Sequence, residues 1–294
     1  MEKIQNTHLE ASFSTLGAEL QSLRDLATQK EILWQGDPQY WNGRSPILFP
    51  ITGGLWNGIS YINGKTYKIP KHGFAKRREW TIIAHSSDSI TFELLPQEGD
   101  ADIYPYDYAL RITYTLQGTR LEAKMSVENR SVAPMYFQIG GHPGIALPFF
   151  AEDNVPDGYL LLEGNASHLL RAGTQGCIEV TDDAPTHFPL PPMEGELIPL
   201  QVSTFENEAL ILEEQIESVV VLDRHKEPIC RVRSSAPVWL FWSMQGLHNP
   251  YVCCEPWYGL PDFQGFEGDI ADRPYIQCAK QGKTWEGFYS IDII

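Results

Sequence analysis

The chain has 294 residues, of which 43% are hydrophobic, and its formal net charge is −16 at pH 7. This charge argues against binding to nucleic acid or to an anionic membrane surface, because both partners require a basic face. No apolar run approaches the length of a membrane span, and the N-terminal residues lack the apolar core of a signal peptide, so we expect a cytoplasmic protein.

The first half of the chain is predicted to form short strands joined by tight turns. Within 61–67, Asn63 and Gly64 suit the type I′ turn of a hairpin, because both central residues of that turn take positive φ. Apolar and polar residues alternate over 120–127, which indicates a strand with one buried face. Further strands are expected at 7–13, 17–23, 31–34, 89–94 and 108–116.

Three segments break this pattern. Residues 41–54 carry two prolines and three glycines among apolar residues, which is too irregular for a helix and too apolar for a solvated loop. Residues 70–78 and 140–144 are glycine-broken loops that each contain one histidine. Irregular backbone of this kind usually lines a site.

The second half also reads as strands. A stretch rich in proline and acidic residues covers 149–199, and the run 218–222 pairs naturally with 229–233. Further strands are expected at 135–139, 208–212, 238–242 and 287–294. Many short strands at this spacing, without an internal repeat, predict an all-β sandwich formed by a single domain over residues 1–294.

Glu255 is the first candidate for catalysis. It follows a short apolar run and precedes Pro256, which disfavours helix for the residue before it and predicts an extended strand end. Tyr251, Trp257 and Tyr258 surround it in the sequence, and partial desolvation would raise its pKa towards the working pH. The alternative is an acid that caps a turn or pairs with an arginine.

Two histidines are candidates for a partner to Glu255. Glycines next to His72 and His142 allow a ligand to approach the backbone closely, and histidine titrates near neutrality. One histidine could therefore donate a proton while Glu255 accepts one, or each could simply hydrogen-bond within its turn. The remaining histidines are interpreted as surface or structural residues: His8, His85, His168, His187, His225 and His248.

Other kinds of site are poorly supported. His72, His142 and Glu255 would suffice as ligands for zinc or iron, but they lack HxH or HExxH spacing, so no metal is expected. No GxSxG elbow or phosphate-binding glycine loop is present. The five cysteines match neither a disulfide framework nor a zinc or CxxC spacing, and free thiols are the simplest interpretation.

Four motifs occur in a fixed order at 43–51, 72–75, 140–143 and 254–259: GRSPILFPI, HGFA, GGHP and CEPWYG. Together they resemble the aldose 1-epimerase (galactose mutarotase-like) family, in particular its bacterial branch with a Glu-Pro-Trp motif. The resemblance runs essentially from end to end of the chain. It implies a large antiparallel β-sandwich, in agreement with the strand pattern.

The resemblance also implies interconversion of the α and β anomers of an aldose without a cofactor. Glu255 matches the catalytic base, His142 the acid that protonates the ring oxygen, and His72 the histidine that binds and polarises the sugar. The expected partner is a small-molecule sugar, and the chain is a monomer or a homodimer.

The substrate-binding residues depart from the family pattern. Where relatives often carry an arginine, this chain has Gly54, and Arg44 is the alternative contact to sugar hydroxyls. Glu208 stands where relatives use an aspartate, and Trp257 would supply an aromatic wall. These departures question galactose as the substrate more than the type of reaction.

Two alternatives remain open. A mutarotase for hexose 6-phosphates would need a cluster of cations, which the chain could supply from Arg44, Lys76, Arg77 and Arg78, although the last three also suit a solvated strand end. A non-catalytic sugar sensor would use the aromatic walls Trp242, Trp257 and Tyr258 equally well. Retention of Glu255 with both histidines favours the enzyme.

Overall fold

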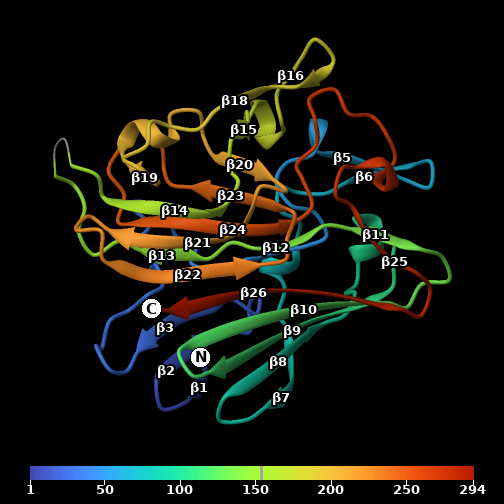
Figure 1. Ribbon diagram of the computed structural model, residues 1–294. Helices are drawn as coiled ribbons and strands as arrows, with labels where there is room; N and C mark the ends of the chain where they lie inside the picture. Colours follow the sequence, from blue (N-terminus) through green and yellow to red (C-terminus); the bar gives the residue numbers. More distant parts are fainter. Residues whose placement is uncertain (153–154) are drawn as a thin grey trace.

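Two large antiparallel sheets form the frame of the protein in the computed structural model, which describes residues 1–152 and 155–294 (Figure 1). The nine-stranded sheet has the order β19 (Leu197–Leu200), β14 (Gly158–Gly164), β21 (Ile216–Asp223), β22 (Pro228–Ser234), β26 (Thr284–Ile293), β10 (Arg120–Asn129), β9 (Tyr108–Gln117), β8 (Ser89–Leu94) and β7 (Thr81–His85). The eight-stranded sheet has the order β18 (His187–Pro189), β15 (His168–Leu170), β20 (Leu210–Glu213), β23 (Val238–Trp242), β24 (Tyr251–Tyr258), β12 (Ile139–Gly141) and β4 (Ile47–Leu48), and β13 (Gly144–Ala146) also pairs with β24.

Smaller elements cover the two sheets. The other strands form one three-stranded and three two-stranded sheets: β1 (Glu2–Gln5), β2 (Leu9–Phe13) and β3 (Leu20–Asp25); β5 (Ile59–Ile62) and β6 (Lys65–Lys68); β11 (Met135–Phe137) and β25 (Gln277–Ala279); β16 (Val180–Thr181) and β17 (Ala184–Pro185). The described helices are short 3₁₀ turns: η1 (Trp56–Gly58), η2 (Ala75–Arg77), η3 (Asp100–Asp102), η4 (Thr174–Gly176), η5 (Val202–Phe205) and η6 (Ile270–Asp272). None of these helices is long and apolar enough to cross a membrane.

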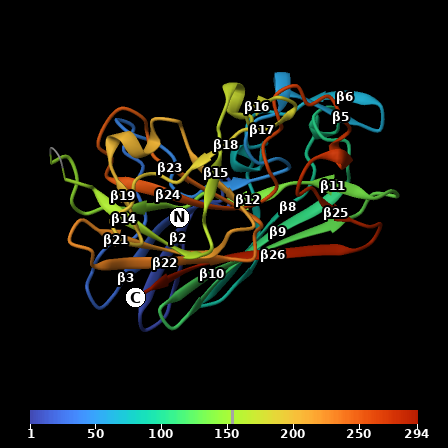
Figure 2. The ribbon, with the colours of Figure 1, turned by 45° about the horizontal axis from the view of Figure 1, so that its top comes forward.

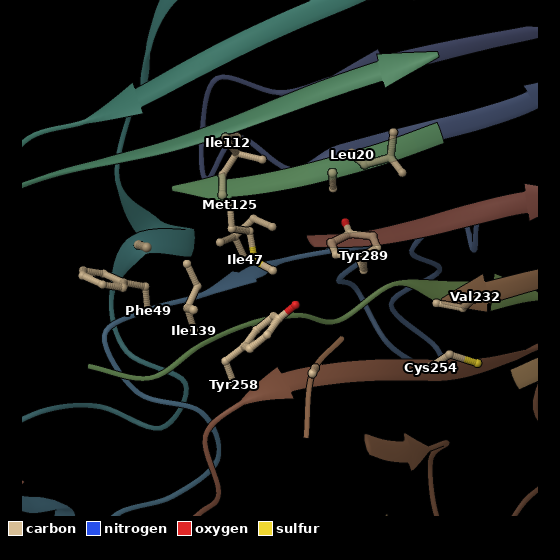
Figure 3. Close-up of a cluster of buried hydrophobic side chains, with 14 of the residues drawn as sticks. Leu20, Ile47, Phe49, Ile112, Met125, Ile139, Val232, Cys254, Tyr258 and Tyr289 are labelled. Atoms are coloured by element: carbon tan, nitrogen blue, oxygen red, sulfur yellow. The ribbon is translucent and has the colours of Figure 1, made fainter. Parts of the chain in front are cut away.

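The main core lies between the two large sheets. On β10 every second residue is buried, as the alternation over 120–127 predicts, and Met125 points inward from this strand. From the opposite sheet, Cys254 and Tyr258 of β24 belong to the same buried cluster, and Figure 3 shows them across from Val232 and Tyr289 of the larger sheet. The all-β sandwich prediction is confirmed.

The other face of the smaller sheet points away from this core. Because side chains alternate along a strand, β24 directs Tyr251, Cys253, Glu255 and Trp257 to that outer face. In both ribbon views β15, β16, β18 and the β5–β6 hairpin lie on this side, opposite β26 and β10 (Figures 1 and 2). The outer face is therefore a sheet surface covered by loops and small elements.

Several local predictions are confirmed. Asn63 and Gly64 have φ of 50° and 74°, as a type I′ turn between β5 and β6 requires. Strands β21 and β22 pair as expected, with Ser218 opposite Arg233.

The prediction of one continuous strand over 135–139 is wrong. Residues 135–137 form β11 beside β25, whereas β12 begins at Ile139 in the eight-stranded sheet. Between them the buried Gln138 side chain accepts a hydrogen bond from the N–H of Thr52 and donates one to the carbonyl of Leu260. Because these bonds hold Gln138 between two loops, the strand is divided at this residue.

Candidate active site

A cavity of about 630 Å³ opens on the outer face of the smaller sheet. Its lining comes from β23 and β24 and from residues within 41–46, 71–77, 172–177 and 208–211. The volume lies within the range of about 300–1,000 Å³ that is usual for small-molecule sites. Segments far apart in the chain, including part of the proline-rich stretch 149–199, thus meet around Glu255.

Glu255 lies inside β24, opposite Leu240 of β23, so the prediction of a strand end is wrong. Pro256 does not end the strand, because its missing N–H falls where the neighbouring ladder is already interrupted. The N–H of Cys254 donates to the carbonyl of Pro143, in the turn between β12 and β13. Residues two apart point to the same side, so Pro256 also faces that turn and costs no ladder hydrogen bond.

The carboxyl group of Glu255 is strongly desolvated. The residue is 1% exposed, and neither carboxyl oxygen makes a hydrogen bond of ordinary geometry within the described part of the chain. Burial raises the pKa of Glu255 well above its usual value, against the opposing effect of the Lys71 and Lys76 ammonium groups. A raised pKa makes this carboxylate a stronger base than an ordinary glutamate, so it holds a proton more readily.

His142 faces Glu255 directly. Its Nε2 lies 3.2 Å from Oε2 of Glu255, and its Nδ1 is buried without a hydrogen-bond partner in the described chain. Burial lowers the pKa of His142 to about 3, while the same desolvation raises that of Glu255. Both effects disfavour charge and therefore favour the state in which the pair shares one proton between its two facing atoms.

Trp41 holds the ring of His142 from the side. The two rings stack with centroids 4.9 Å apart and an interplanar angle of 25°. The Trp34 indole N–H donates to the carbonyl of Trp41 at 2.7 Å, which fixes this part of the loop. The irregular, apolar segment 41–54 was predicted to line a site, but the sequence did not single out Trp41 as a functional residue.

The tautomer of His72 makes its Nε2 a hydrogen-bond donor. Its Nδ1 accepts the N–H of Gly53 at 3.1 Å, so in the neutral ring the proton resides on Nε2. Burial lowers the pKa of His72 well below its usual value, which keeps the ring neutral. Gly73 allows this turn: its φ is 67°, and a Cβ there would lie 2.0 Å from the Phe49 carbonyl oxygen.

The predicted binding residues divide into two groups. Glu208 and Lys76 line the cavity, and Trp257 lines it from a buried position, with its ring edge-on to His72. Arg44 does not line the cavity, because its guanidinium donates to Oε1 of Gln21 at 2.6 Å. The structure therefore does not support Arg44 as a sugar contact.

Two other sequence interpretations are corrected. Tyr258 does not line the cavity, because its side chain points into the main core. Its hydroxyl forms a hydrogen bond with Oγ of Ser235, with 2.8 Å between the two oxygens. The run of cations is no strand end but the 3₁₀ turn η2. Arg78 pairs with the buried Asp100, whereas Lys76 and Arg77 line the cavity together with Lys71, which the sequence had not singled out.

One cluster of metal-ligating groups lies beside the cavity. The ligand atoms of His142, Cys253 and Glu255 lie within 4.8 Å of one another, and all three residues are buried. This set differs from the trio of His72, His142 and Glu255 considered from the sequence. Cys253 joins it because it precedes Glu255 by two residues on the same face of β24.

A family model described as aldose 1-epimerase matches residues 2–287. The chain therefore belongs to the aldose 1-epimerase family, and it is an isomerase of the sugar epimerase class. Its relative LacX (chromosomal) from Lactococcus lactis subsp. lactis is 29% identical over 303 residues, covering 99% of each chain. A protein of Escherichia coli K12 provisionally named glucose-6-phosphate 1-epimerase is 29% identical over 150 residues, 47% of this chain and 48% of the relative.

Solved structures agree with this assignment. A galactose mutarotase related enzyme from Lactobacillus acidophilus superimposes with a TM-score of 0.88 at 30% identity, covering 100% of this chain and 97% of that one. A galactose mutarotase-like protein from Lactobacillus casei ATCC 334 has a TM-score of 0.90 at 27% identity, with 100% of both chains covered. The large antiparallel β-sandwich is thus shared over the whole chain.

Proposed function

We propose that the protein interconverts the α and β anomers of an aldohexose, with Glu255 and His142 as the acid–base pair. The observation that carries this proposal is the 3.2 Å approach of His142 Nε2 to Glu255 Oε2 inside a cavity of sugar size. Ring opening requires one proton to leave the anomeric hydroxyl and another to reach the ring oxygen. A pair that holds a single proton between two neighbouring atoms can do both.

The reaction then follows from this proton count. With the proton on His142, Glu255 takes the proton of the anomeric hydroxyl while His142 protonates the ring oxygen, and the C1–O5 bond breaks. The proton of the pair now resides on Glu255. After rotation of the aldehyde, Glu255 returns its proton to the carbonyl oxygen, O5 attacks C1, and His142 recovers its own. No net proton is consumed.

His72 and Trp41 support this exchange. The Nε2–H of His72 is available to a sugar oxygen, because Nδ1 is already bonded to Gly53. Trp41 prevents the His142 ring from rotating away from Glu255. Fixed groups of this kind reduce the reorganisation that the transition state requires.

The experiment is exchange NMR and polarimetry on freshly dissolved α-D-glucose and α-D-galactose, with wild type and Glu255→Gln. We expect wild type to accelerate equilibration, and the variant to lose roughly the 10²–10⁴-fold that one acid–base group contributes. Binding should largely survive, because Gln keeps the shape of Glu. Unchanged turnover would show that Glu255 is not the base, and binding without acceleration in wild type would indicate a sugar sensor.

A hexose 6-phosphate is the second candidate substrate. Lys71, Lys76 and Arg77 all line the cavity, and a phosphate group is bound by such clusters of donors. Burial, followed by the charge of Arg77, lowers the pKa of Lys76, and a phosphate dianion beside it would reverse that effect. The same NMR assay with glucose 6-phosphate compares the two substrate classes directly.

A further inference from the structure

We propose that Cys253, His142 and Glu255 form a binding site for Zn²⁺ or a similar thiophilic divalent cation, and that its occupation switches the isomerase off. Sulfur, imidazole nitrogen and carboxylate oxygen are the three ligand types that zinc uses in proteins. The inhibitory consequence rests on the proposed function of the Glu255–His142 pair. The metal site itself rests on the geometry alone.

The distances suit zinc. Tetrahedral ligands at zinc bond lengths lie about 3.3 Å apart for a nitrogen–oxygen edge and about 3.6 Å for an edge to sulfur. His142 Nε2 and Glu255 Oε2 are already 3.2 Å apart. One ligand atom from each of the three residues lies within 4.8 Å of the others, so closure on a metal requires movements of only about 1 Å, within the range of small side-chain rotations.

The backbone presents these groups together. Cys253 and Glu255 are two residues apart in β24 and therefore project from the same face. His142 belongs to the turn between β12 and β13, which the hydrogen bond from the Cys254 N–H to the Pro143 carbonyl holds against β24 at 3.0 Å. Since the strand and this turn together fix all three Cα positions, little ordering remains to oppose metal binding.

The ligand atoms also have free capacity. Both oxygens of Glu255 are buried without a hydrogen bond of ordinary geometry in the described chain, and His142, whose Nε2 faces Oε2, is only 8% exposed. A buried polar atom without a partner is costly, and a metal ion would supply one. On binding, the Cys253 thiol and the Glu255–His142 pair each release one proton to solvent, and the thiolate, the imidazole nitrogen and the carboxylate form the bonds to the metal.

Occupation would block catalysis because the metal uses the lone pairs that carry the proton. His142 and Glu255 cannot then exchange a proton with the sugar. His142 and Glu255 line the cavity, so a water or a sugar hydroxyl there would supply the fourth ligand. Mg²⁺, which prefers oxygen ligands in octahedral geometry, should have little effect.

Binding is tested first with Co²⁺ as a spectroscopic substitute for Zn²⁺. The wild-type protein should show a thiolate-to-cobalt charge-transfer band and tetrahedral d–d bands, and Zn²⁺ should displace them. Both signals should be lost in Cys253→Ala. Cys278→Ser, which removes an exposed thiol, should keep them. Absence of the bands in wild type, or their persistence in Cys253→Ala, would overturn the site.

Inhibition is tested on anomer exchange, with each variant compared with its own metal-free rate. We expect Zn²⁺ to inhibit wild type and Cys278→Ser alike. In Cys253→Ala the Zn²⁺ concentration for half inhibition should rise strongly. Loss of a residue that only contacts a metal ligand lowers metal affinity roughly 10–100-fold, and loss of a ligand itself should cost more. Equal inhibition of Cys253→Ala would overturn the proposal. Cobalt bands in a protein that turns over no sugar would refute the proposed function and leave the metal site standing.

Discussion

Desolvation acts on two facing residues of the cavity. Burial opposes the charged form of both Glu255 and His142, and their facing atoms lie 3.2 Å apart, so the two groups titrate as one pair. His72, 5.7 Å from His142 between ring centroids, is kept neutral by burial and is aligned by the N–H of Gly53. The three groups identified from the sequence thus meet in one place, and their proposed roles follow from their different hydrogen bonds.

The pH dependence of kcat/KM should report this pair. At pH values below the His142 pKa of about 3, both members of the pair carry a proton and neither can accept one from the sugar. At pH values above the raised pKa of Glu255, the pair has lost its only proton and cannot donate one. We expect a plateau bounded by an acid limb near pH 3 and by an alkaline limb above the usual carboxyl range. Exchange NMR, corrected for spontaneous mutarotation, measures it.

The contrary result would be a single acid limb near pH 6.5, the ordinary pKa of histidine. That profile would mean that His142 titrates as a solvated imidazole and that its proton is not shared with Glu255. His142→Asn serves as the comparison, because it removes one titrating member of the pair and should abolish the plateau together with most of the rate.

At the scale of the elements, a buried ion pair connects the loops around the cavity. Asp262 accepts from Nε of Arg273 at 2.6 Å and from the N–H of Trp56 at 2.9 Å. Arg273 also donates to Oγ of Ser60 in β5, and the Asp262 carbonyl accepts the N–H of Ile178. This pair therefore ties η1, β5, η6 and the loop after η4 to the end of β24.

Breaking this ion pair should destabilise the protein strongly. Asp262 and Arg273 are 2% and 3% exposed, so Arg273→Met leaves a buried carboxylate without its partner, at a cost of about 3–5 kcal/mol. Urea unfolding of the variant measures the loss in free energy of unfolding.

A matched control is available on the surface. Lys124 and Glu286 also form an ion pair, at 2.8 Å, but their side chains are 47% and 55% exposed. Lys124→Met should cost at most about 1 kcal/mol, because solvent screens such pairs. If both variants lost the same free energy, the buried pair would contribute no more than a surface one.

Gly54 gives the loop at η4 its position over the cavity. Its N–H donates to the carbonyl of Gly176 at 3.1 Å, and a Cβ at this residue would lie 2.2 Å from the carbonyl oxygen of Gln175. Because both neighbours are backbone atoms, a side chain cannot be accommodated unless the loop moves. The loop thus occupies the space next to the position where the family resemblance places an arginine.

Gly54→Ala should therefore displace the wall of the cavity formed by Gly176 and Cys177. We expect the KM for the sugar to rise more than kcat falls, because Glu255 and His142 lie on other segments. Gly64→Ala is the control, because nothing lies within 4 Å of its Cβ position and it lies outside the cavity lining, so the strain from its φ of 74° stays in the β5–β6 turn. Equal KM values for the two variants would show that the loop position does not affect sugar binding.

On the scale of the whole molecule, charge is distributed unevenly. The net charge is −16, yet Lys71, Lys76 and Arg77 converge on the cavity. Long-range repulsion opposes an anionic substrate, whereas these local cations favour its phosphate group. Neutral hexoses experience neither effect, so the response to salt separates the two substrate classes.

Raising the ionic strength from about 0.01 to about 1 M shortens the screening length from about 30 to about 3 Å. If a hexose 6-phosphate is the substrate, its KM should rise with salt, and Lys76→Met should flatten that dependence while Lys124→Met leaves it unchanged. A KM that does not respond to salt, together with turnover of unphosphorylated hexoses, would assign the cavity to neutral sugars.

The fold class and the candidate residues that meet in the cavity could be predicted from the sequence because both are marked by local patterns. Alternation over 120–127 and the Asn63-Gly64 turn predict strands and a hairpin from nearest neighbours alone, and the structure confirms them. Glycines beside His72 and His142, and the proline after Glu255, likewise mark special backbone. The four motifs, in their order along the chain, then indicate the enzyme family.

Only the tertiary structure decided which residues share an environment. Glu255 lies within a strand rather than at its end because the interrupted ladder beside β24 tolerates Pro256. Arg44 turns to Gln21, whereas Trp41 stacks on His142 and Cys253 lies beside it. Desolvation and proximity arise from packing between segments distant in the chain, so no local pattern of residues contains them.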